Sequence, residues 1–97
     1  MLNGKQKRYL KGLASTMTAV VQVGKSGVND RVLFSLKEAL VARELVKIKV
    51  LKNCLTDVSE VAEELANATG AQLVQTIGRN VLLYQPNQDK SAIILPK

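Results

Sequence analysis

Residues 45–77 contain two different hydrophobic periods in succession, and this order limits the possible folds more than any other feature of the chain. In LVKIKVLK (45–52), apolar residues alternate with lysines, as expected for a strand with one buried face. The apolar residues of 57–69 are spaced as on one side of a helix, and Gly70 follows where a helix typically ends. AQLVQTI (71–77) predicts a further strand. A strand, a helix and a second strand in this order predict a mixed α/β fold.

The flanking segments extend this pattern in both directions. Pro86 ends the last apolar run, and GRN between the last two runs predicts a hairpin. The predicted helices are 3–15, 29–42 and 57–69, and the predicted strands are 19–23, 45–52, 71–77 and 81–85. The order is α-β-α-β-α-β-β. We therefore expect two layers, a mixed four-stranded sheet backed by helices, in which each strand–helix–strand unit joins parallel neighbours.

The chain has the length of one domain, which we assign to residues 1–97 with a C-terminal tail at 86–97. The apolar AIIL within that tail either docks on the domain or stays loose. No apolar run approaches the ~20 residues that span a bilayer, and the N-terminus does not have the pattern of a secretory signal. We expect no membrane partner, and a monomer.

Cysteine and histidine usage argues against several chemistries. Cys54 is the single cysteine, so no disulfide forms within the chain and a cytoplasmic location is the simpler expectation. The chain has no histidine, which removes a histidine-based triad and leaves no plausible zinc cluster. Four acidic residues in 57–69 are interpreted as a solvated helix face: Asp57, Glu60, Glu63 and Glu64. We therefore expect that the protein is not an enzyme and that it binds no cofactor, no metal and no small-molecule substrate.

The charge distribution is more informative than the net charge of +6. Residues 1–29 carry five basic residues and no acidic one, whereas residues 56–69 carry four acidic residues and no basic one. This separation predicts a basic side and an acidic side. Such a surface suits a polyanionic partner.

The segment VGKSGV (23–28) lies between a predicted strand and a predicted helix. A nucleotide-triphosphate loop would need a glycine at the position of Ala19, so that motif is disfavoured. Two interpretations stay open. Gly24 and Gly27 could simply permit a tight turn with a solvated Lys25. Alternatively, the loop could bring its backbone amides and the start of the next helix against an RNA sugar-phosphate backbone.

Aromatic residues are scarce: Tyr9, Phe34 and Tyr84. Proteins that read single strands base by base usually stack the bases on aromatic side chains. We expect Tyr9 and Phe34 to pack inside, which leaves Tyr84 alone. Backbone-directed binding of a folded RNA therefore fits this composition better.

Five stretches together resemble the YhbY-like, or CRM-domain, RNA-binding family of bacterial ribosome-associated proteins and chloroplast splicing factors. They are KQKRYLKGLA (5–14), VVQVGKSGV (20–28), ELVKIKVL (44–51), TGA (69–71) and QTIGRNVLLYQP (75–86). The resemblance implies a fold like the C-terminal domain of bacterial translation initiation factor three. It also implies a GxxG loop comparable to that of KH domains, and association with large-subunit ribosomal RNA or its precursor particles. Family members often carry a basic residue where this chain has Gln85, and an asparagine where it has Ser26.

On the residues and the resemblance together, we predict a non-enzymatic RNA-binding protein that assists ribosome assembly. The alternative is an adaptor whose basic face binds an acidic protein. The resemblance assigns the loop to Gly24, Lys25, Ser26 and Gly27 and the hairpin motif to Ile77, Gly78 and Arg79. The full set of predicted RNA-binding residues is Gly24, Lys25, Ser26, Gly27, Lys5, Lys7, Arg8, Lys11, Arg31, Gly78 and Arg79.

Overall fold

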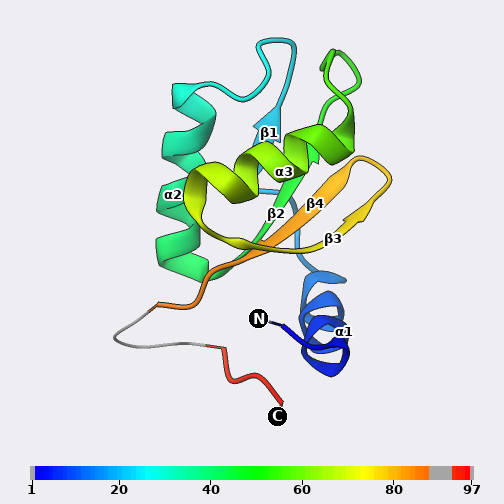
Figure 1. Ribbon diagram of the computed structural model, residues 1–97, viewed down its shortest axis with the longest axis vertical. Helices are drawn as coiled ribbons and strands as arrows, with labels where there is room; N and C mark the ends of the chain where they lie inside the picture. Colours follow the sequence, from blue (N-terminus) through cyan, green and yellow to red (C-terminus); the bar gives the residue numbers. More distant parts are fainter. Residues whose placement is uncertain (1, 88–92, 97) are drawn as a thin grey trace.

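A computed structural model describes residues 2–87 and 93–96 of the chain (Figure 1). Within them lie the helices α1 (Gly4–Ala14), α2 (Asp30–Arg43) and α3 (Val58–Thr69). The strands are β1 (Val21–Val23), β2 (Leu45–Val50), β3 (Gln72–Ile77) and β4 (Asn80–Tyr84). The element order and the mixed α/β class are confirmed, with bounds that differ from the prediction by at most two residues.

Local capping explains where the helices begin and end. At α1, the amide of Gln6 donates to Asn3 Oδ1 at 2.8 Å, and the amide of Asn3 donates to Gln6 Oε1 at 3.0 Å. This reciprocal pair is a capping box. At α2, Asn29 Oδ1 accepts from the amide of Val32 at 2.9 Å. Gly70 ends α3 with a φ of 77°, in the left-handed region that glycine favours.

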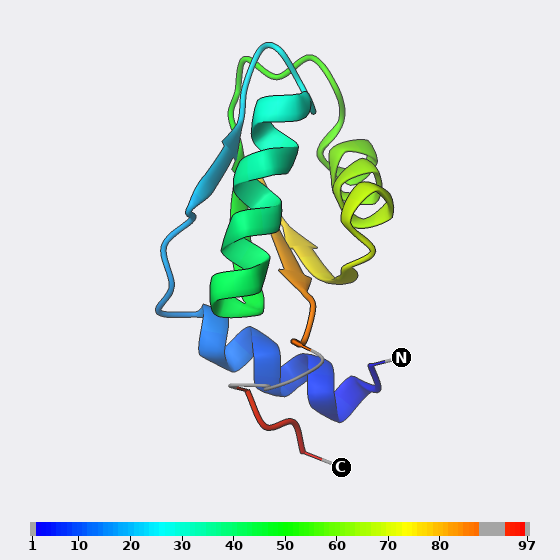
Figure 2. The same cartoon turned by 90° about the vertical axis from the view of Figure 1, so that its left-hand side faces the viewer.

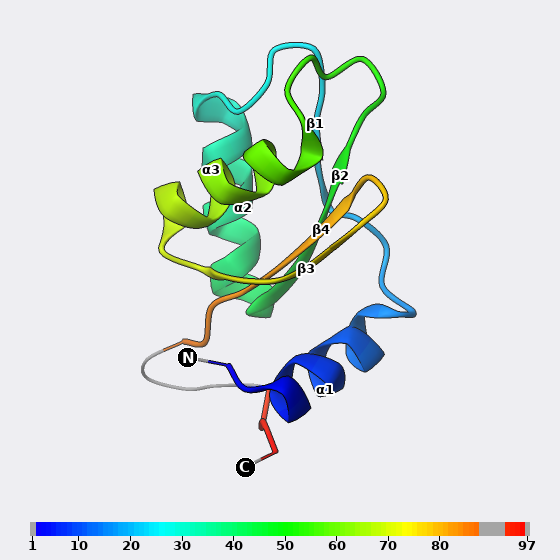
Figure 3. The ribbon, with the colours of Figure 1, turned by 45° about the vertical axis from the view of Figure 1, so that its right-hand side comes forward.

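The strand order is β1-β2-β4-β3. β1 and β2 are parallel neighbours as predicted, but β2 and β3 are not neighbours. Instead β4 lies between them and pairs antiparallel with both (Figure 3). The physical reason is the sequence VLLY in β4, which is buried on both faces and therefore belongs in the interior of the sheet. The more polar β3 takes the edge.

Two apolar cores lie on opposite faces of the sheet. α2 and α3 cover one face, where Leu36, Leu40 and Leu65 pack on alternate residues of β2 and β4. On the other face, Leu10 and Ala14 of α1 pack with a second set of sheet residues, Leu45, Val74, Leu82 and Tyr84. Figure 2 shows that α1 crosses the end of the molecule opposite the loops that precede α2 and α3. α1 therefore covers only part of its face of the sheet.

The burial of the aromatic residues differs from the prediction. Tyr84 is 2% exposed, whereas Tyr9 is 43% exposed and Phe34 is 66% exposed, so the expectation that these two pack inside is wrong. Phe34 lies two residues before buried Leu36, and residues two apart on a helix face different sides. Tyr9 sits at the margin of the α1 stripe, beside Leu10. Because Tyr84 is buried, it is not available to stack on a base.

The described part of the tail docks on the second core. Ile93 and Leu95 pack against it, while Ile94 is exposed. The side-chain amide of Gln6 donates to the carbonyl of Pro96 at 3.0 Å. Ala92, the first residue of the AIIL run, lies outside the described residues.

Candidate nucleic-acid interface

The GKSG segment forms a tight turn that projects from the end of β1. The amide of Gly27 donates to the carbonyl of Gly24 at 2.9 Å, so Lys25 and Ser26 occupy the corner of the turn. Both of these residues are exposed. The turn therefore presents a lysine and a hydroxyl to solvent.

The backbone conformation requires glycine at only one of the two glycine positions of this turn. Gly27 has a φ of 68°, a conformation that side chains rarely adopt. Gly24 does not have a positive φ, and a Cβ placed on it would make only ordinary contacts, at 3.5 Å from Asn53 Oδ1 and Leu51 Cδ1. The turn needs glycine at position 27 but not at 24.

The turn leads directly into the start of α2. Asn29 caps this helix through the amide of Val32, which leaves the amides of the preceding first-turn residues outside the intrahelical ladder. These amides and the helix dipole make the region electropositive. Arg31 is exposed in this first turn, beside an exposed Asp30 that moderates the local charge.

The sheet brings two further loops to the end of the molecule that carries the GKSG turn. The amide of Leu51 donates to the carbonyl of Val23 at 2.8 Å, which joins the end of β2 to the end of β1. The amide of Val50 donates to the carbonyl of Arg79 at 2.7 Å, and Arg79 Nη1 donates to the carbonyl of Leu51 at 3.4 Å. We call this surface the loop end and define it as residues 24–27, 51–56 and 78–79.

The loop end contains one basic residue that the sequence analysis did not select. Lys52 is exposed immediately after β2, on the loop that contacts Gly24 through Leu51 and Asn53. The sequence contained a signal that would place Lys52 beside the GKSG turn. Parallel strands end at the same edge of a sheet, β1 precedes the GKSG turn, and Lys52 follows β2. The loop end therefore gathers Lys25, Lys52 and Arg79. The hairpin turns at Gly78, whose φ of 57° suits the first position of a two-residue turn.

The basic residues of α1 lie elsewhere. Lys5, Arg8 and Lys11 are exposed and Lys7 is half-buried, all on the helix that packs at the other end of the sheet. Figure 1 shows α1 and the GKSG turn at opposite ends of the long axis. The eleven predicted RNA-binding residues thus fall into two groups: seven at the loop end and the start of α2, and four on α1.

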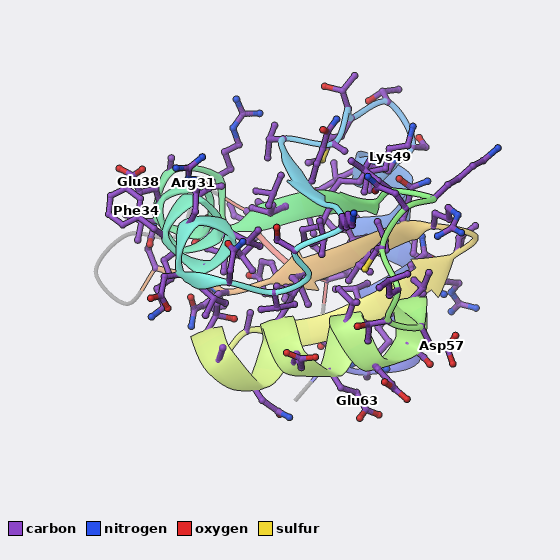
Figure 4. The ribbon with its side chains drawn as sticks, turned by 90° about the horizontal axis from the view of Figure 1, so that it is seen from above. Arg31, Phe34, Glu38, Lys49, Asp57 and Glu63 are labelled. Atoms are coloured by element: carbon purple, nitrogen blue, oxygen red, sulfur yellow. The ribbon has the colours of Figure 1, made fainter. Side chains whose placement is uncertain are left out.

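The acidic residues of α3 and its N-cap belong to the helix that covers the sheet face opposite to Lys47 and Lys49. Asp57, Glu60, Glu63 and Glu64 are all exposed. Seen from the loop end, Lys49 and Glu63 project from opposite sides of the molecule (Figure 4). Figure 4 also shows Phe34 and Arg31 projecting from α2.

The described residues form neither a metal centre nor a helix that could span a membrane. Among residues 2–87 and 93–96, no three histidine, cysteine, aspartate or glutamate side chains are grouped so that they could hold a metal ion. In the same residues, no helix has the length and apolar character to cross a membrane. Cys54 is buried, with its thiol 3.7 Å from the carbonyl oxygen of Thr56.

The topology and the loop end together define a class: a small mixed α/β domain in which a glycine-flanked basic turn precedes a capped helix. The domain model of the CRS1 / YhbY (CRM) domain family matches residues 2–85. The chain belongs to this family.

Relatives and a solved structure agree with this assignment. The chain is 49% identical over 96 residues to "Probable RNA-binding protein YqeI" of Bacillus subtilis, covering 99% of this chain and 100% of that protein. It is 36% identical to a protein of Haemophilus influenzae named "RNA-binding protein", covering 99% and 96% of the two chains. The solution structure of SAV1595 from Staphylococcus aureus has a TM-score of 0.82 with this fold, at 42% identity and with 99% and 100% of the two chains covered.

Proposed function

We propose that this protein is a non-enzymatic RNA-binding protein of the cytoplasm that binds ribosomal RNA in large-subunit precursors and assists ribosome assembly. Membership of the CRM family and the names of the relatives support RNA as the partner. The family resemblance of the sequence supports the ribosomal target. The loop end supports the mode of binding.

The single observation that carries this proposal is the convergence of the GKSG turn, Lys52 and Arg79 at one end of the sheet. Lys25 and Lys52 supply mobile charges, and the guanidinium of Arg79 supplies a planar set of donors that fits a phosphate. The bare backbone at Gly24 lets a sugar-phosphate chain approach the turn. The start of α2 adds backbone amides and the positive end of the helix dipole. This arrangement binds phosphates and carries little information about sequence.

A charge reversal with a matched control tests the loop. Lys25→Glu is expected to lower affinity for large-subunit ribosomal RNA by about tenfold, or roughly 1.4 kcal/mol. The control is Lys37→Glu, which makes the same change at an exposed position of α2 outside the loop end and is expected to leave affinity nearly unchanged. Equal losses in both variants would show that the loop has no special role.

Salt dependence and cell fractionation separate RNA binding from the adaptor alternative. Each phosphate contact contributes about −0.7 to −0.9 to the slope of log affinity against log salt, so Lys25→Glu should flatten the slope by one such contact. In a density gradient of cell lysate, the protein is expected to sediment with large-subunit precursors at low salt and to leave them at high salt. A complex that resists nuclease and keeps a protein partner would favour the adaptor and refute the proposal.

A further inference from the structure

α1 covers only part of the sheet face on which it packs. The register aligns three rows of residues across β2, β4 and β3 on this face. The row Leu45, Tyr84 and Gln72 lies beneath α1, and Leu45 and Tyr84 belong to its apolar core. The next rows are Lys47, Leu82 and Gln75, and then Lys49, Asn80 and Ile77.

A pocket of about 340 Å³ lies where the C-terminal end of α1 meets the uncovered rows. This volume is within the ~300–1,000 Å³ range of small-ligand sites. The sheet supplies its floor and α1 supplies one wall. The lining residues are Lys11, Ala14, Ser15, Lys47, Gln75, Ile77, Asn80, Val81 and Leu82.

The wall of the pocket is fixed in place by Lys47. Its ammonium donates to the carbonyl of Ala14 at 3.3 Å and to that of Met17 at 3.2 Å. A cation at this position stabilises the negative end of the α1 dipole. An ammonium has three donors, so after these two bonds one donor can still serve a ligand.

The pocket combines apolar contact with unused amide groups. Leu82, Ile77 and Ala14 supply apolar surface. The side-chain amides of Gln75 and Asn80 form no hydrogen bond to the described residues. Each carries both a donor and an acceptor, and they project from adjacent rows of neighbouring strands. Lys11 adds an exposed cation at the edge.

We propose that this pocket binds one unpaired nucleobase of the RNA, with its phosphate at Lys11. The inference rests on the proposed RNA-binding function and adds a site to it. Unpaired bases are recognised by hydrogen bonds to their edges and by contact with their flat faces, and pockets that take a single extruded base use apolar side chains beside aromatic ones for that contact. Gln75 and Asn80 match the base edge, Leu82 and Ile77 match its face, and the cations match the phosphate.

The pocket is within reach of an RNA strand held at the loop end. Lys47 is four residues before Leu51 along β2, which corresponds to ~13 Å at about 3.3 Å per residue. Stacked nucleotides in one strand advance ~3.4 Å each, so about four nucleotides cover this separation. A single-stranded hexanucleotide can therefore reach both places.

Nuclear magnetic resonance of the isotope-labelled full chain tests the proposal with hexanucleotides of uridine, cytidine or adenosine and with an abasic hexamer. We expect at least one base-containing hexamer to shift the side-chain amide signals of Gln75 and Asn80. The abasic hexamer should shift the signals of Lys25–Gly27 and leave the pocket signals in place. Equal pocket shifts with the abasic hexamer would overturn the proposal, because the pocket would then bind phosphate.

Variants give a second measurement. Replacing both Gln75 and Asn80 by alanine should lower affinity for the base-containing hexamer by about tenfold and leave affinity for the abasic hexamer unchanged. Thr76→Ala is the matched control, because Thr76 is exposed on the same strand and faces the opposite side of the sheet. If the double variant does not fold, Gln75→Glu keeps the shape of the side chain and should lower affinity by adding a negative charge.

The outcomes also separate this proposal from the broader function. Shifts at the loop end without shifts in the pocket, for every hexamer, would overturn the base site and leave RNA binding intact. No shift in either region with any hexamer would overturn the base site, and the Lys25→Glu comparison on ribosomal RNA would then decide the broader function separately.

Discussion

Glu44 joins α2 to β2 and gives the sharpest stability prediction. It is 1% exposed, and among the described residues it is the one non-glycine residue with a positive φ, at 63°. Its carboxylate accepts from the amide of Asn87 at 2.6 Å and from the amide of Ile93 at 3.1 Å. Its own carbonyl accepts from the amide of Gln85 at 2.8 Å. Glu44 therefore ties the centre of the chain to the segment after β4.

Truncation of this side chain should be costly. Hydrogen bonds to a charged group contribute ~1.5–3 kcal/mol each, so two of them give about 3–6 kcal/mol. Water can reach the half-buried amides of Asn87 and Ile93 once the carboxylate is removed, so we expect the lower end of this range. Glu44→Ala should therefore lower the free energy of unfolding by about 3 kcal/mol, a large part of the ~5–15 kcal/mol typical of a domain.

A second substitution separates the carboxylate from the backbone. Glu44→Gly removes the same hydrogen bonds but relieves the strain of the positive φ (φ 63°, ψ -42°), which costs on the order of 1–3 kcal/mol for a residue with a Cβ. The greater freedom of glycine in the unfolded chain offsets about 0.4–1 kcal/mol of this relief. Glu44→Gly should thus be more stable than Glu44→Ala by up to about 2.5 kcal/mol.

The assay is urea denaturation followed by circular dichroism, with midpoints and slopes measured for each variant. Glu38→Ala, at an exposed glutamate of α2, is the control and should change stability by less than about 0.5 kcal/mol. A loss of less than about 1 kcal/mol in Glu44→Ala would refute the role of the carboxylate. A glycine variant less stable than the alanine variant would refute the backbone argument.

Three further predictions concern the turn, α1 and α2. Gly24→Ala should leave stability unchanged or raise it by about 0.4–1 kcal/mol while weakening RNA binding. Gly27→Ala should lower the free energy of unfolding, measured by urea denaturation, by roughly 1 kcal/mol, because Gly27, unlike Gly24, has a positive φ. Lys47→Met should cost about 0.5–1 kcal/mol and speed hydrogen exchange in α1 but not in α3, because it removes the cation from the end of α1. Phe34→Ser should change the unfolding free energy by less than about 0.5 kcal/mol, because that side chain is 66% exposed.

Local signals in the sequence predicted most of the secondary structure. Asn3 and Asn29 cap helices as side-chain acceptors, and Gly70 ends a helix in the left-handed region, each within a few residues of the atoms that it serves. The alternation in 45–52 correctly separates the buried face of β2 from its lysines. Such features are readable from sequence because both partners lie in one short segment.

Features that depend on residues far apart in the sequence could not be predicted from it. The bonds of Glu44 join residues more than 40 positions apart, and nothing near Arg43 or Leu45 signals a buried carboxylate. Lys47 binds carbonyls about 30 positions earlier in the chain, and the alternation of 45–52 does not signal these bonds. The predicted RNA-binding residues were chosen by charge and family pattern, and those grounds do not tell which of them share a surface.

The observed strand order, which differs from the predicted one, also assembles both proposed sites. With β3 beside β2, Arg79 in the turn before β4 would lie one strand farther from the loop after β2, or about 5 Å. The inserted β4 instead pairs Asn80 with Lys49 and lets Arg79 donate to the carbonyl of Leu51. The same insertion places Leu82 between Lys47 and Gln75, so the pocket has an apolar floor between its polar groups. The apolar character of VLLY, which places β4 inside the sheet, thereby determines which basic and amide groups lie together at the two proposed sites.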